Sequence, residues 1–237
     1  CVEQMEKELP LGCLRDESAA ACPRAPLPAA PAVNEYFCDM EQHQAPMAEE
    51  DAGFQELRLK FTGFGGQCIL SLGICVAEAA RLEKRYTTWF PSYGPEQRGG
   101  SAACSVVISG RPIGSPSVDR PDVLVCMNQP SYERFAKDVK PGGTVIVDAT
   151  VPLTVAAPEG VRVISMPAID LSIKMGVPKA ANTMMLAALA KLGVTGLKNE
   201  SLQTALDASF KGKPALVEKN RLLLREAEAW MEKNLNV

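Results

Sequence analysis

Apolar and polar positions alternate immediately before a glycine-rich stretch in the first third of the chain. Apolar residues at positions 57, 59 and 61 are separated by Arg58 and Lys60, a period of two that predicts a strand. From residue 69 to residue 80 the apolar positions recur at helical spacing, with Ser71 and Glu78 on the other face. The pattern therefore predicts a strand, a short turn and a helix in succession.

Three glycines, Gly63, Gly65 and Gly66, occupy the predicted turn and are followed by Gln67. The first N–H groups of a helix have no partner within the helix, and the helix dipole favours an anion there. The turn can therefore cradle a phosphate or admit the backbone of a ligand. A tight strand-to-helix turn that needs small residues and binds nothing fits equally well. Both interpretations stay open on the turn alone.

The rest of the chain continues the alternation of strands and helices. The stretch 122–128, whose residues 123–127 are all apolar, suits a strand buried on both faces. Strands are expected at 85–90, 102–109, 122–128, 144–148 and 161–165, and helices at 129–139, 179–192, 201–210 and 214–233. This order predicts an α/β fold with a Rossmann-like open, mostly parallel sheet, flanking helices and a helical C-terminal end.

The last predicted helix, 214–233, carries a broad apolar stripe. We expect this stripe to face the core. It consists of Leu216, Val217, Leu222, Leu223 and Leu224.

The charge of the chain is unevenly distributed. Residues 1–56 carry 12 acidic and 3 basic side chains, whereas residues 57–237 carry 16 acidic and 22 basic ones. Prolines at positions 23, 26, 28, 31 and 46 also interrupt the first segment. We therefore divide the chain into an irregular, acidic, Pro/Ala-rich extension at 1–56, which suits wrapping around a partner, and an α/β domain at 57–237.

Composition excludes several classes of protein. The chain has 237 residues, 46% of them hydrophobic, with no apolar run of 18 residues, so no membrane association is expected. The first residues are acidic rather than basic and apolar, which argues against a signal peptide. Its basic residues are scattered and match no nucleic-acid motif. Eight cysteines without a C-x-x-C pair favour a reduced, cytoplasmic setting.

Candidate catalytic side chains are scarce in the domain. His43 is the sole histidine and lies in the extension, so 57–237 cannot supply a Ser-His-Asp triad or a histidine-ligated metal. The extension also holds Cys1, Cys13, Cys22 and Cys38, whose wide spacing matches no common zinc or iron–sulfur motif. No metal site is therefore predicted in this chain.

A dinucleotide-binding site is an alternative that the glycine turn raises. The stretch Gly63-Phe-Gly-Gly-Gln-Cys68 departs from G-x-G-x-x-G at its sixth position. Such a site also needs an acidic residue at the end of the second strand to hold the ribose. That strand here ends in Trp89-Phe-Pro-Ser, and Glu83 precedes it. An independent nucleotide-binding oxidoreductase domain is thus the weaker hypothesis.

Several short motifs in a fixed order resemble one known family. They are Gly63-Phe-Gly-Gly-Gln67, Tyr93-Gly-Pro-Glu-Gln-Arg-Gly-Gly100, Pro112-Ile-Gly-Ser-Pro116, Pro121-Asp-Val-Leu-Val125, Asn128-Gln-Pro-Ser131, Pro141-Gly-Gly143 and Pro178-Lys-Ala-Ala-Asn-Thr-Met-Met185. In this order they resemble the gamma subunit of the 2-oxoacid:ferredoxin (acceptor) oxidoreductases and an internal domain of single-chain pyruvate:ferredoxin oxidoreductases. The resemblance covers about 57–235. Cys68 and Gln97 depart from it, standing where the family usually has Gly and Met.

The resemblance implies a function that this chain cannot perform alone. These enzymes oxidatively decarboxylate a 2-oxoacid to acyl-CoA and CO₂ on thiamine diphosphate, with Mg²⁺, and pass electrons through 4Fe–4S clusters to ferredoxin. It implies alpha and beta partner subunits, with a ferredoxin-like delta subunit where the complex has one. Thiamine diphosphate, Mg²⁺ and the clusters are expected on those partners, and coenzyme A is the co-substrate. This chain is then a non-catalytic subunit of a hetero-oligomer that supports assembly and coenzyme A access. A purely structural assembly subunit is the alternative.

The resemblance also gives a set of candidate binding residues and no catalytic ones. They lie in three loops that all follow predicted strands, so they should share one edge of the sheet. The candidates are Gly63, Gly65, Gly66, Gln67, Tyr93, Gly94, Arg98, Gly99, Gly100, Asn128 and Ser131.

Each polar candidate also has a structural interpretation. Arg98 can bind a phosphate in a bidentate way or form an interface ion pair. Tyr93 can stack on a ligand or pack on a partner. Ser131 can bind a ligand or cap the helix that carries Arg134.

The cysteines and two methionines of the domain have less to distinguish them. Cys75, Cys104 and Cys126 lie on apolar elements and are expected in the core, as are Met184 and Met185. Cys68 alone lies near a helix N-terminus, where a thiol becomes more reactive.

Overall fold

The computed structural model describes residues 51, 53–93 and 101–235. They belong to one compact unit of the chain, Pro46–Val237. Most of the predicted extension, 1–56, thus lies outside the described residues and stays a prediction. Two residues on its domain side contact the α/β domain: Asp51 forms an ion pair with Arg85, and the Arg85 guanidinium lies 4.3 Å from the centre of the Phe54 ring.

Six strands form a single sheet in the order β2-β3-β1-β4-β5-β6. The adjacent strands β1, β4, β5 and β6 run parallel to one another, whereas β3 is antiparallel to both β1 and β2. The sheet is thus mixed but mostly parallel, as predicted. The strands are β1 (Leu57–Phe64), β2 (Tyr86–Tyr93), β3 (Ser101–Ser109), β4 (Val123–Cys126), β5 (Thr144–Asp148) and β6 (Arg162–Met166).

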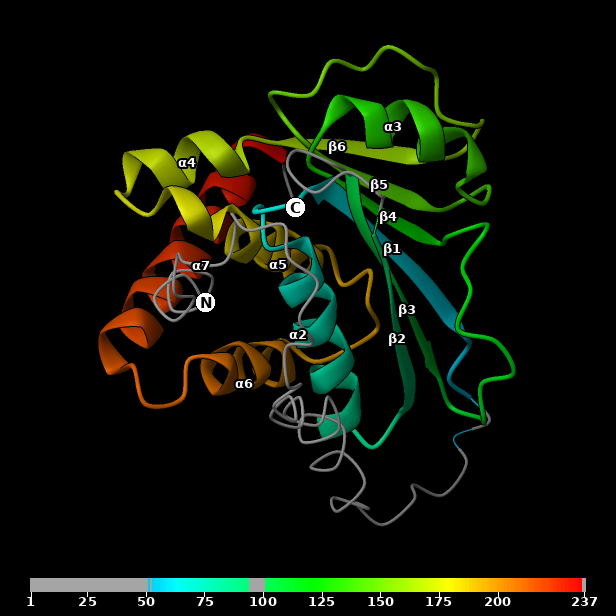
Figure 1. The fold of residues 1–237 in the computed structure, drawn as a ribbon, viewed down its shortest axis with the longest axis horizontal. Helices are drawn as coiled ribbons and strands as arrows, with labels where there is room; N and C mark the ends of the chain where they lie inside the picture. Colours follow the sequence, from blue (N-terminus) through cyan, green and yellow to red (C-terminus); the bar gives the residue numbers. More distant parts are fainter. Residues whose placement is uncertain (1–50, 52, 94–100, 236–237) are drawn as a thin grey trace, which may run out of the picture. The chain divides into compact units, whose positions relative to one another are not determined.

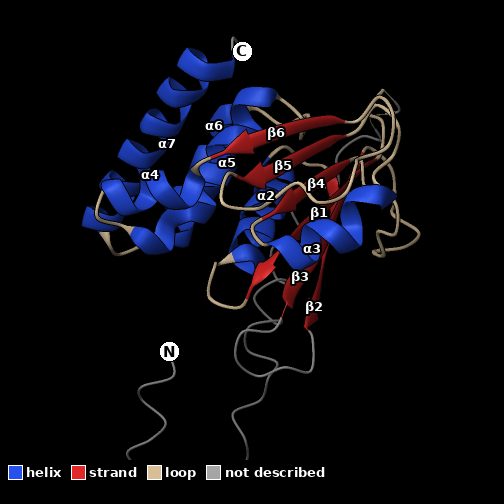
Figure 2. Ribbon diagram, turned by 90° about the horizontal axis from the view of Figure 1, so that it is seen from above, coloured by secondary structure: helices blue, strands red, loops and turns tan. Residues whose placement is uncertain are grey.

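Helices cover both faces of the sheet, and Figure 2 shows α3 on one side and the other helices on the opposite side. The larger core lies between the sheet and α2, α4, α5, α6 and α7, and the smaller one lies under α3. The helices, labelled in Figure 1, are α2 (Ile69–Leu82), α3 (Gln129–Phe135), α4 (Ala168–Lys174), α5 (Ala181–Leu192), α6 (Asn199–Ser209) and α7 (Pro214–Leu235), with 3-10 turns at Ala136–Asp138 and Pro178–Ala180.

The alternation in β1 assigns its two faces. Leu59 and Phe61 are fully buried in the larger core. Lys60 points to the α3 side, where its ammonium lies 4.4 Å from the centre of the Phe135 ring. Burial lowers the Lys60 pKa, while Asp119 and Asp138 act in the opposite direction. Strand β4 is buried on both faces, as its continuous apolar run predicted.

The second strand extends further than its sequence indicated. Strand β2 continues through Pro91 to Tyr93, although the proline was expected to end it. Because β2 pairs with β3 on one side only, it is an edge strand, and an edge strand tolerates a residue without an N–H donor. The turn between β2 and β3, residues 94–100, lies outside the described residues.

Two of the helices after β6 differ from what the sequence predicted. The apolar stripe of α7 is only partly buried: Leu223 and Leu224 face the core, whereas Leu216 and Leu222 are exposed, Leu222 by 52%. Asn220 is buried in their place and accepts a hydrogen bond from the Thr183 hydroxyl at 2.8 Å. Helix α4, which no prediction placed, follows β6 directly.

Candidate functional site

The carboxyl ends of three strands meet at one edge of the sheet. The parallel register places Thr62 of β1 beside Cys126 of β4. On the other side of β1, Gly63 pairs with Ala102 of β3, which pairs with Tyr93 of β2. The expectation that the loops after these strands begin at a shared edge is therefore confirmed for the strand ends.

Strands β1 and β4 lie side by side, but their chains leave toward opposite faces. After β1 the chain enters α2 on the face of the larger core, and after β4 it enters α3 on the other face. Such a reversal between neighbouring parallel strands opens a crevice outside their carboxyl ends, where open α/β proteins bind ligands. In this chain that switch point, called the crevice below, lies between the turn at 63–68 and the segment 127–131.

Steric contacts make glycine necessary at the first position of the turn. A Cβ atom on Gly63 would lie 2.6 Å from Gln67 Oε1 and 2.7 Å from Ile69 Cγ1, closer than real Cβ atoms come. Gly65 and Gly66 are exposed, and Gly66 has a φ of 99°, a conformation that favours glycine. Cys68 is left-handed as well, with a φ of 56°. A glycine at this position would adopt the same conformation without steric cost.

Gln67 joins the turn to the end of β4. Its Oε1 accepts a hydrogen bond from the Phe64 N–H at 2.7 Å, and its Nε2 donates to the Met127 carbonyl at 3.0 Å. A second link lies two residues earlier along β4, where the Thr62 hydroxyl donates a hydrogen bond to the Val125 carbonyl at 2.9 Å. The Gln67 amide is thus committed to fixing the two sides of the crevice, a role that its position in the sequence did not reveal.

Asn128 begins α3, and it corrects one interpretation of Ser131. The Asn128 side-chain oxygen accepts the Ser131 N–H at 3.0 Å, so Asn128 is the N-cap and Ser131 is not. Both side chains are only 2% exposed. Their remaining polar atoms, Asn128 Nδ2 and Ser131 Oγ, have no hydrogen-bond partner among the described residues. Buried polar atoms normally have a partner, so these two would need a bound water or a ligand group that reaches them.

The other predicted binding residues are not placed. Tyr93 ends β2, and its side chain is not described. Gly94, Arg98, Gly99 and Gly100 lie outside the described residues. Their expected contribution to the edge therefore remains a prediction.

Asp148, which the sequence analysis overlooked, occupies the end of β5. It is fully buried, and it accepts the Thr150 N–H and the Ile169 N–H at 3.0 Å each. The carboxylate thus joins the end of β5 to the first turn of α4. An acidic residue that closes an otherwise apolar strand was the available signal for such a link.

Three cysteines are core residues, as predicted. Cys75, Cys104 and Cys126 are at most 3% exposed, and burial raises the pKa of each thiol to about 12. Cys68 is half-buried at the turn. Met184 and Met185 are fully buried in the larger core, as expected.

The sheet order weakens the dinucleotide hypothesis further. A dinucleotide fold places its second strand directly beside the first, so that the acidic residue at its end reaches the ribose. Here β3 lies between β1 and β2. Glu83 accepts the Lys198 N–H at 2.6 Å, which joins the end of α2 to the start of α6. It is thus used structurally.

The described residues offer neither a metal cluster nor a membrane-spanning helix. Over 51, 53–93 and 101–235, no group of three or more His, Cys, Asp or Glu residues lies together as a metal site would need. No helix within that part of the chain is long and apolar enough to cross a bilayer.

Fold and crevice together define an open α/β domain whose candidate ligand edge lies at a topological switch point. Residues 58–230 match the model of the family described as "Pyruvate ferredoxin/flavodoxin oxidoreductase". The crystal structure of the keto/oxoacid ferredoxin oxidoreductase gamma subunit from Geobacter sulfurreducens superposes with a TM-score of 0.63 at 26% identity, covering 74% of this chain and 96% of that one.

Two relatives extend the comparison. The chain is 33% identical over 183 residues to the pyruvate/ketoisovalerate oxidoreductases common subunit gamma of Pyrococcus furiosus, covering 72% of this chain and 95% of that subunit. It is 42% identical over 236 residues to ketoisovalerate oxidoreductase subunit VorA of Methanothermobacter thermautotrophicus, covering 98% of this chain. This chain spans 49% of the length of that VorA protein. The chain belongs to the pyruvate ferredoxin/flavodoxin oxidoreductase family, as a gamma-type chain.

Proposed function

We propose that this chain is the gamma-type part of a multi-subunit 2-oxoacid:ferredoxin oxidoreductase. The complex would convert a 2-oxoacid and coenzyme A to acyl-CoA and CO₂ and reduce ferredoxin. The observation that carries the proposal is the family match over 58–230, together with a gamma relative of which 95% is covered. The names of that relative and of VorA point to 2-oxoacids as the substrate class.

Within this proposal the chain has no catalytic residue of its own. Thiamine diphosphate would supply the electron sink for decarboxylation, and holding it requires Mg²⁺ ligands. The described residues contain no cluster of donors for Mg²⁺ or for an iron–sulfur centre, so the donor set does not fit these groups. We therefore assign both to alpha and beta subunits and to a ferredoxin-like delta subunit where the complex has one.

Coenzyme A access is the role that we assign to the crevice. Two buried polar atoms, Asn128 Nδ2 and Ser131 Oγ, lack partners there, and the glycine turn opposite keeps side chains small. A ligand amide or phosphate, or the backbone of a neighbouring subunit, would satisfy both atoms. Arg98, in the predicted loop beside this edge, would add a charge-assisted hydrogen bond.

Reconstitution tests the assembly part of the proposal. The chain should be produced alone and together with candidate alpha, beta and delta subunits, and 2-oxoacid-dependent dye reduction should be measured with coenzyme A. We expect activity only in the assembled complex. Turnover by the purified single chain would contradict the non-catalytic role, and failure to copurify with thiamine-binding subunits would contradict the assignment to the complex.

Two substitutions test coenzyme A access. Ser131→Ala removes a buried hydroxyl that has no hydrogen-bond partner among the described residues, so the stability of the free chain should hardly change. In the assembled enzyme, Ser131→Ala and Arg98→Ala should each raise the KM for coenzyme A more than the KM for the 2-oxoacid. Loss of a charge-assisted hydrogen bond at Arg98 should raise the KM for coenzyme A roughly ten- to a hundredfold. Unchanged coenzyme A kinetics in both intact complexes would refute the ligand role, and loss of assembly would assign these residues to the interface.

A further inference from the structure

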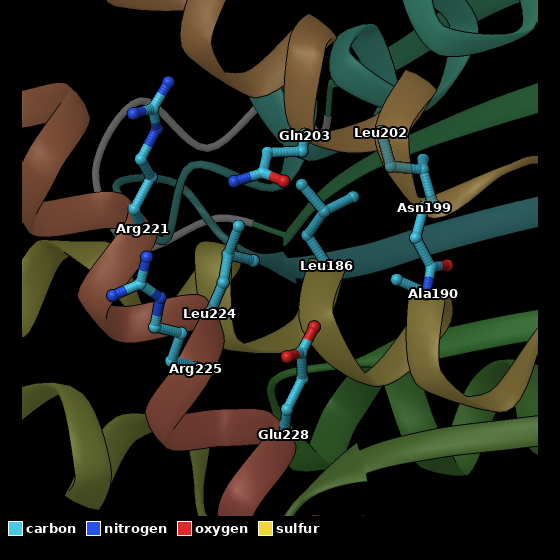
Figure 3. A pocket seen from close by; sticks show the side chains of 9 residues that line it. All are labelled: Leu186, Ala190, Asn199, Leu202, Gln203, Arg221, Leu224, Arg225 and Glu228. Carbon is cyan, nitrogen blue, oxygen red and sulfur yellow. The ribbon is translucent and has the colours of Figure 1, made fainter.

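A cavity lies among α5, α6 and α7, and none of its lining residues belongs to the crevice (Figure 3). Its volume is about 220 Å³. Two of the helices contribute residues one turn apart, which therefore share a face: Leu186 and Ala190 from α5, and Asn199 and Gln203 from α6. The remaining lining residues are Leu202, Arg221, Leu224, Arg225 and Glu228.

The floor of the cavity is apolar and its rim is polar. Leu186 and Leu202 are 1% exposed and Leu224 is 9% exposed, and all three belong to the larger core. Asn199 and Gln203 are exposed on α6, so their amides lie at the rim. A fitting ligand therefore has an alkyl body and a polar head.

Two opposite charges at the rim are available. Arg221 is already engaged, since it pairs with Asp207 at 2.8 Å and with Glu218 at 3.3 Å. Within the described part of the chain, Arg225 and Glu228 take part in no ion pair and no side-chain hydrogen bond. Figure 3 shows the Glu228 carboxylate pointing from α7 toward Leu186.

Size and charge together specify the ligand. A volume of about 220 Å³ is an order of magnitude above the roughly 10–15 Å³ that a single water molecule needs, so the cavity admits a small organic ligand. We propose that this cavity binds an aliphatic α-amino acid of the size of valine or leucine. Arg225 holds the carboxylate, Glu228 accepts hydrogen bonds from the ammonium group, and the leucine floor buries the alkyl group.

Simpler ligands leave one of the two charges unsatisfied. A carboxylic acid without an amine pairs with Arg225 but places its own charge near Glu228. An amine without a carboxylate pairs with Glu228 but places its own positive charge near Arg225. A phosphate is repelled by Glu228 and cannot use the apolar floor. A zwitterion with an alkyl side chain satisfies both charges and the floor.

This inference is independent of the proposed function, because the cavity and the crevice share no residue. The two regions nevertheless touch a common helix. Leu202, part of the cavity floor, has its carbonyl 3.8 Å from the Cys75 thiol of α2, and α2 begins at the glycine turn.

Calorimetric titration of the full chain with single amino acids tests the proposal directly. L-Leucine and L-valine should bind saturably, with a Kd in the millimolar range or tighter. Glycine has the same head group but no alkyl group, so it should bind about tenfold more weakly or worse. L-Leucine analogues that lack the amine, such as 4-methylpentanoate, should also bind more weakly than L-leucine.

Two charge-neutralising variants and one control make the test specific. Arg225→Gln and Glu228→Gln should each weaken L-leucine binding at least about tenfold, because each removes a charge-assisted contact. Glu228→Gln should also improve binding of 4-methylpentanoate, since the repulsion between carboxylates is gone. Glu226→Gln, an exposed α7 residue outside the cavity lining, is the matched control and should leave binding unchanged.

Several outcomes would overturn the proposal. One is no saturable heat with L-leucine or L-valine up to about 10 mM, a concentration at which even weak specific binding is measurable. Another is equal binding of L-leucine by the wild type and by both variants, once circular dichroism shows that the variants are folded. Equal binding of L-leucine and 4-methylpentanoate to the wild type would show a carboxylate site instead.

Discussion

Gly63 and Cys68 fix the turn after β1 by two different physical constraints. Gly63 is limited by space, because a Cβ atom there would collide with Gln67 and Ile69. Cys68 is limited by its backbone, which is left-handed with a φ of 56°. Only glycine adopts that conformation without steric cost.

Gly63→Ala should destabilise the domain by about 1–3 kcal/mol, the usual cost of inserting a methyl group into a packed site. The shift in the urea unfolding midpoint measures this change. Gly114→Ala is the control, because its Cβ would meet nothing within 4 Å. A Gly63→Ala variant as stable as Gly114→Ala would show that the turn relaxes freely.

Cys68 should respond to backbone conformation rather than to loss of its thiol. Cys68→Gly should be as stable as the wild type or up to about 1 kcal/mol more stable, because relief of the left-handed strain outweighs the added chain entropy. Cys68→Val should lose about 1–2 kcal/mol, since a β-branched residue fits that region worst. Chemical denaturation of both variants provides the comparison, and equal stabilities would contradict this account.

At the scale of elements, single polar side chains join segments that the sheet alone leaves separate. Gln67 links the start of α2 to the end of β4, and Asp148 links the end of β5 to the start of α4. Asn128, which follows β4, caps the N-terminus of α3. The edge that carries the candidate site is therefore held by side-chain hydrogen bonds in addition to backbone pairing.

Gln67→Ala should lower the free energy of unfolding by about 1–3 kcal/mol, because two partly buried hydrogen bonds are lost. Amide exchange at Phe64 should also accelerate, since its N–H loses its acceptor. Gln129→Ala is the matched control: its amide bonds to Glu133 at an exposed site and should cost no more than about 0.5 kcal/mol. An unchanged Phe64 exchange rate would show that Gln67 does not hold the turn.

At the scale of the whole molecule, the buried thiols couple folding to pH. Cys75 and Cys104 lie in the larger core and Cys126 lies under α3. Burial raises the pKa of each from 9.0 to about 12 in the folded chain. The unfolded chain therefore loses these protons first as pH rises. Their contribution to stability is complete below pH 9 and is lost progressively between pH 9 and 12.

Cys126→Ala should flatten this pH dependence. Between pH 9.5 and 10.5 each buried thiol should lower the free energy of unfolding by about 1 kcal/mol per pH unit, and the variant lacks one of them. Urea unfolding at several pH values gives the slope. Val145→Ala, in the same core cluster, should lower stability equally at all pH values. Identical slopes in the wild type and Cys126→Ala would contradict the thiol assignment.

The sequence by itself determined most of the elements and the family. Alternating and continuous apolar runs identified the strands, because the spacing of apolar residues reflects whether one face or both faces of a strand are buried. The ordered short motifs indicated the gamma-type family, to which the match over 58–230 shows that the chain belongs. The core positions of Cys75, Cys104, Cys126 and the paired methionines also followed from local pattern.

Only the tertiary structure decided how the strands pair and which side chains hold the edge. The position of β3 between β1 and β2 depends on pairing between distant segments, which periodicity does not encode. Leu222 belongs to a helical apolar stripe but is exposed, because the elements that pack against α7 select the buried face. The bond from Gln67 to Met127 spans 60 residues, and the cavity among α5, α6 and α7 joins three separate helices. Such contacts exist only once the chain has folded, since they combine residues with no local signal in common.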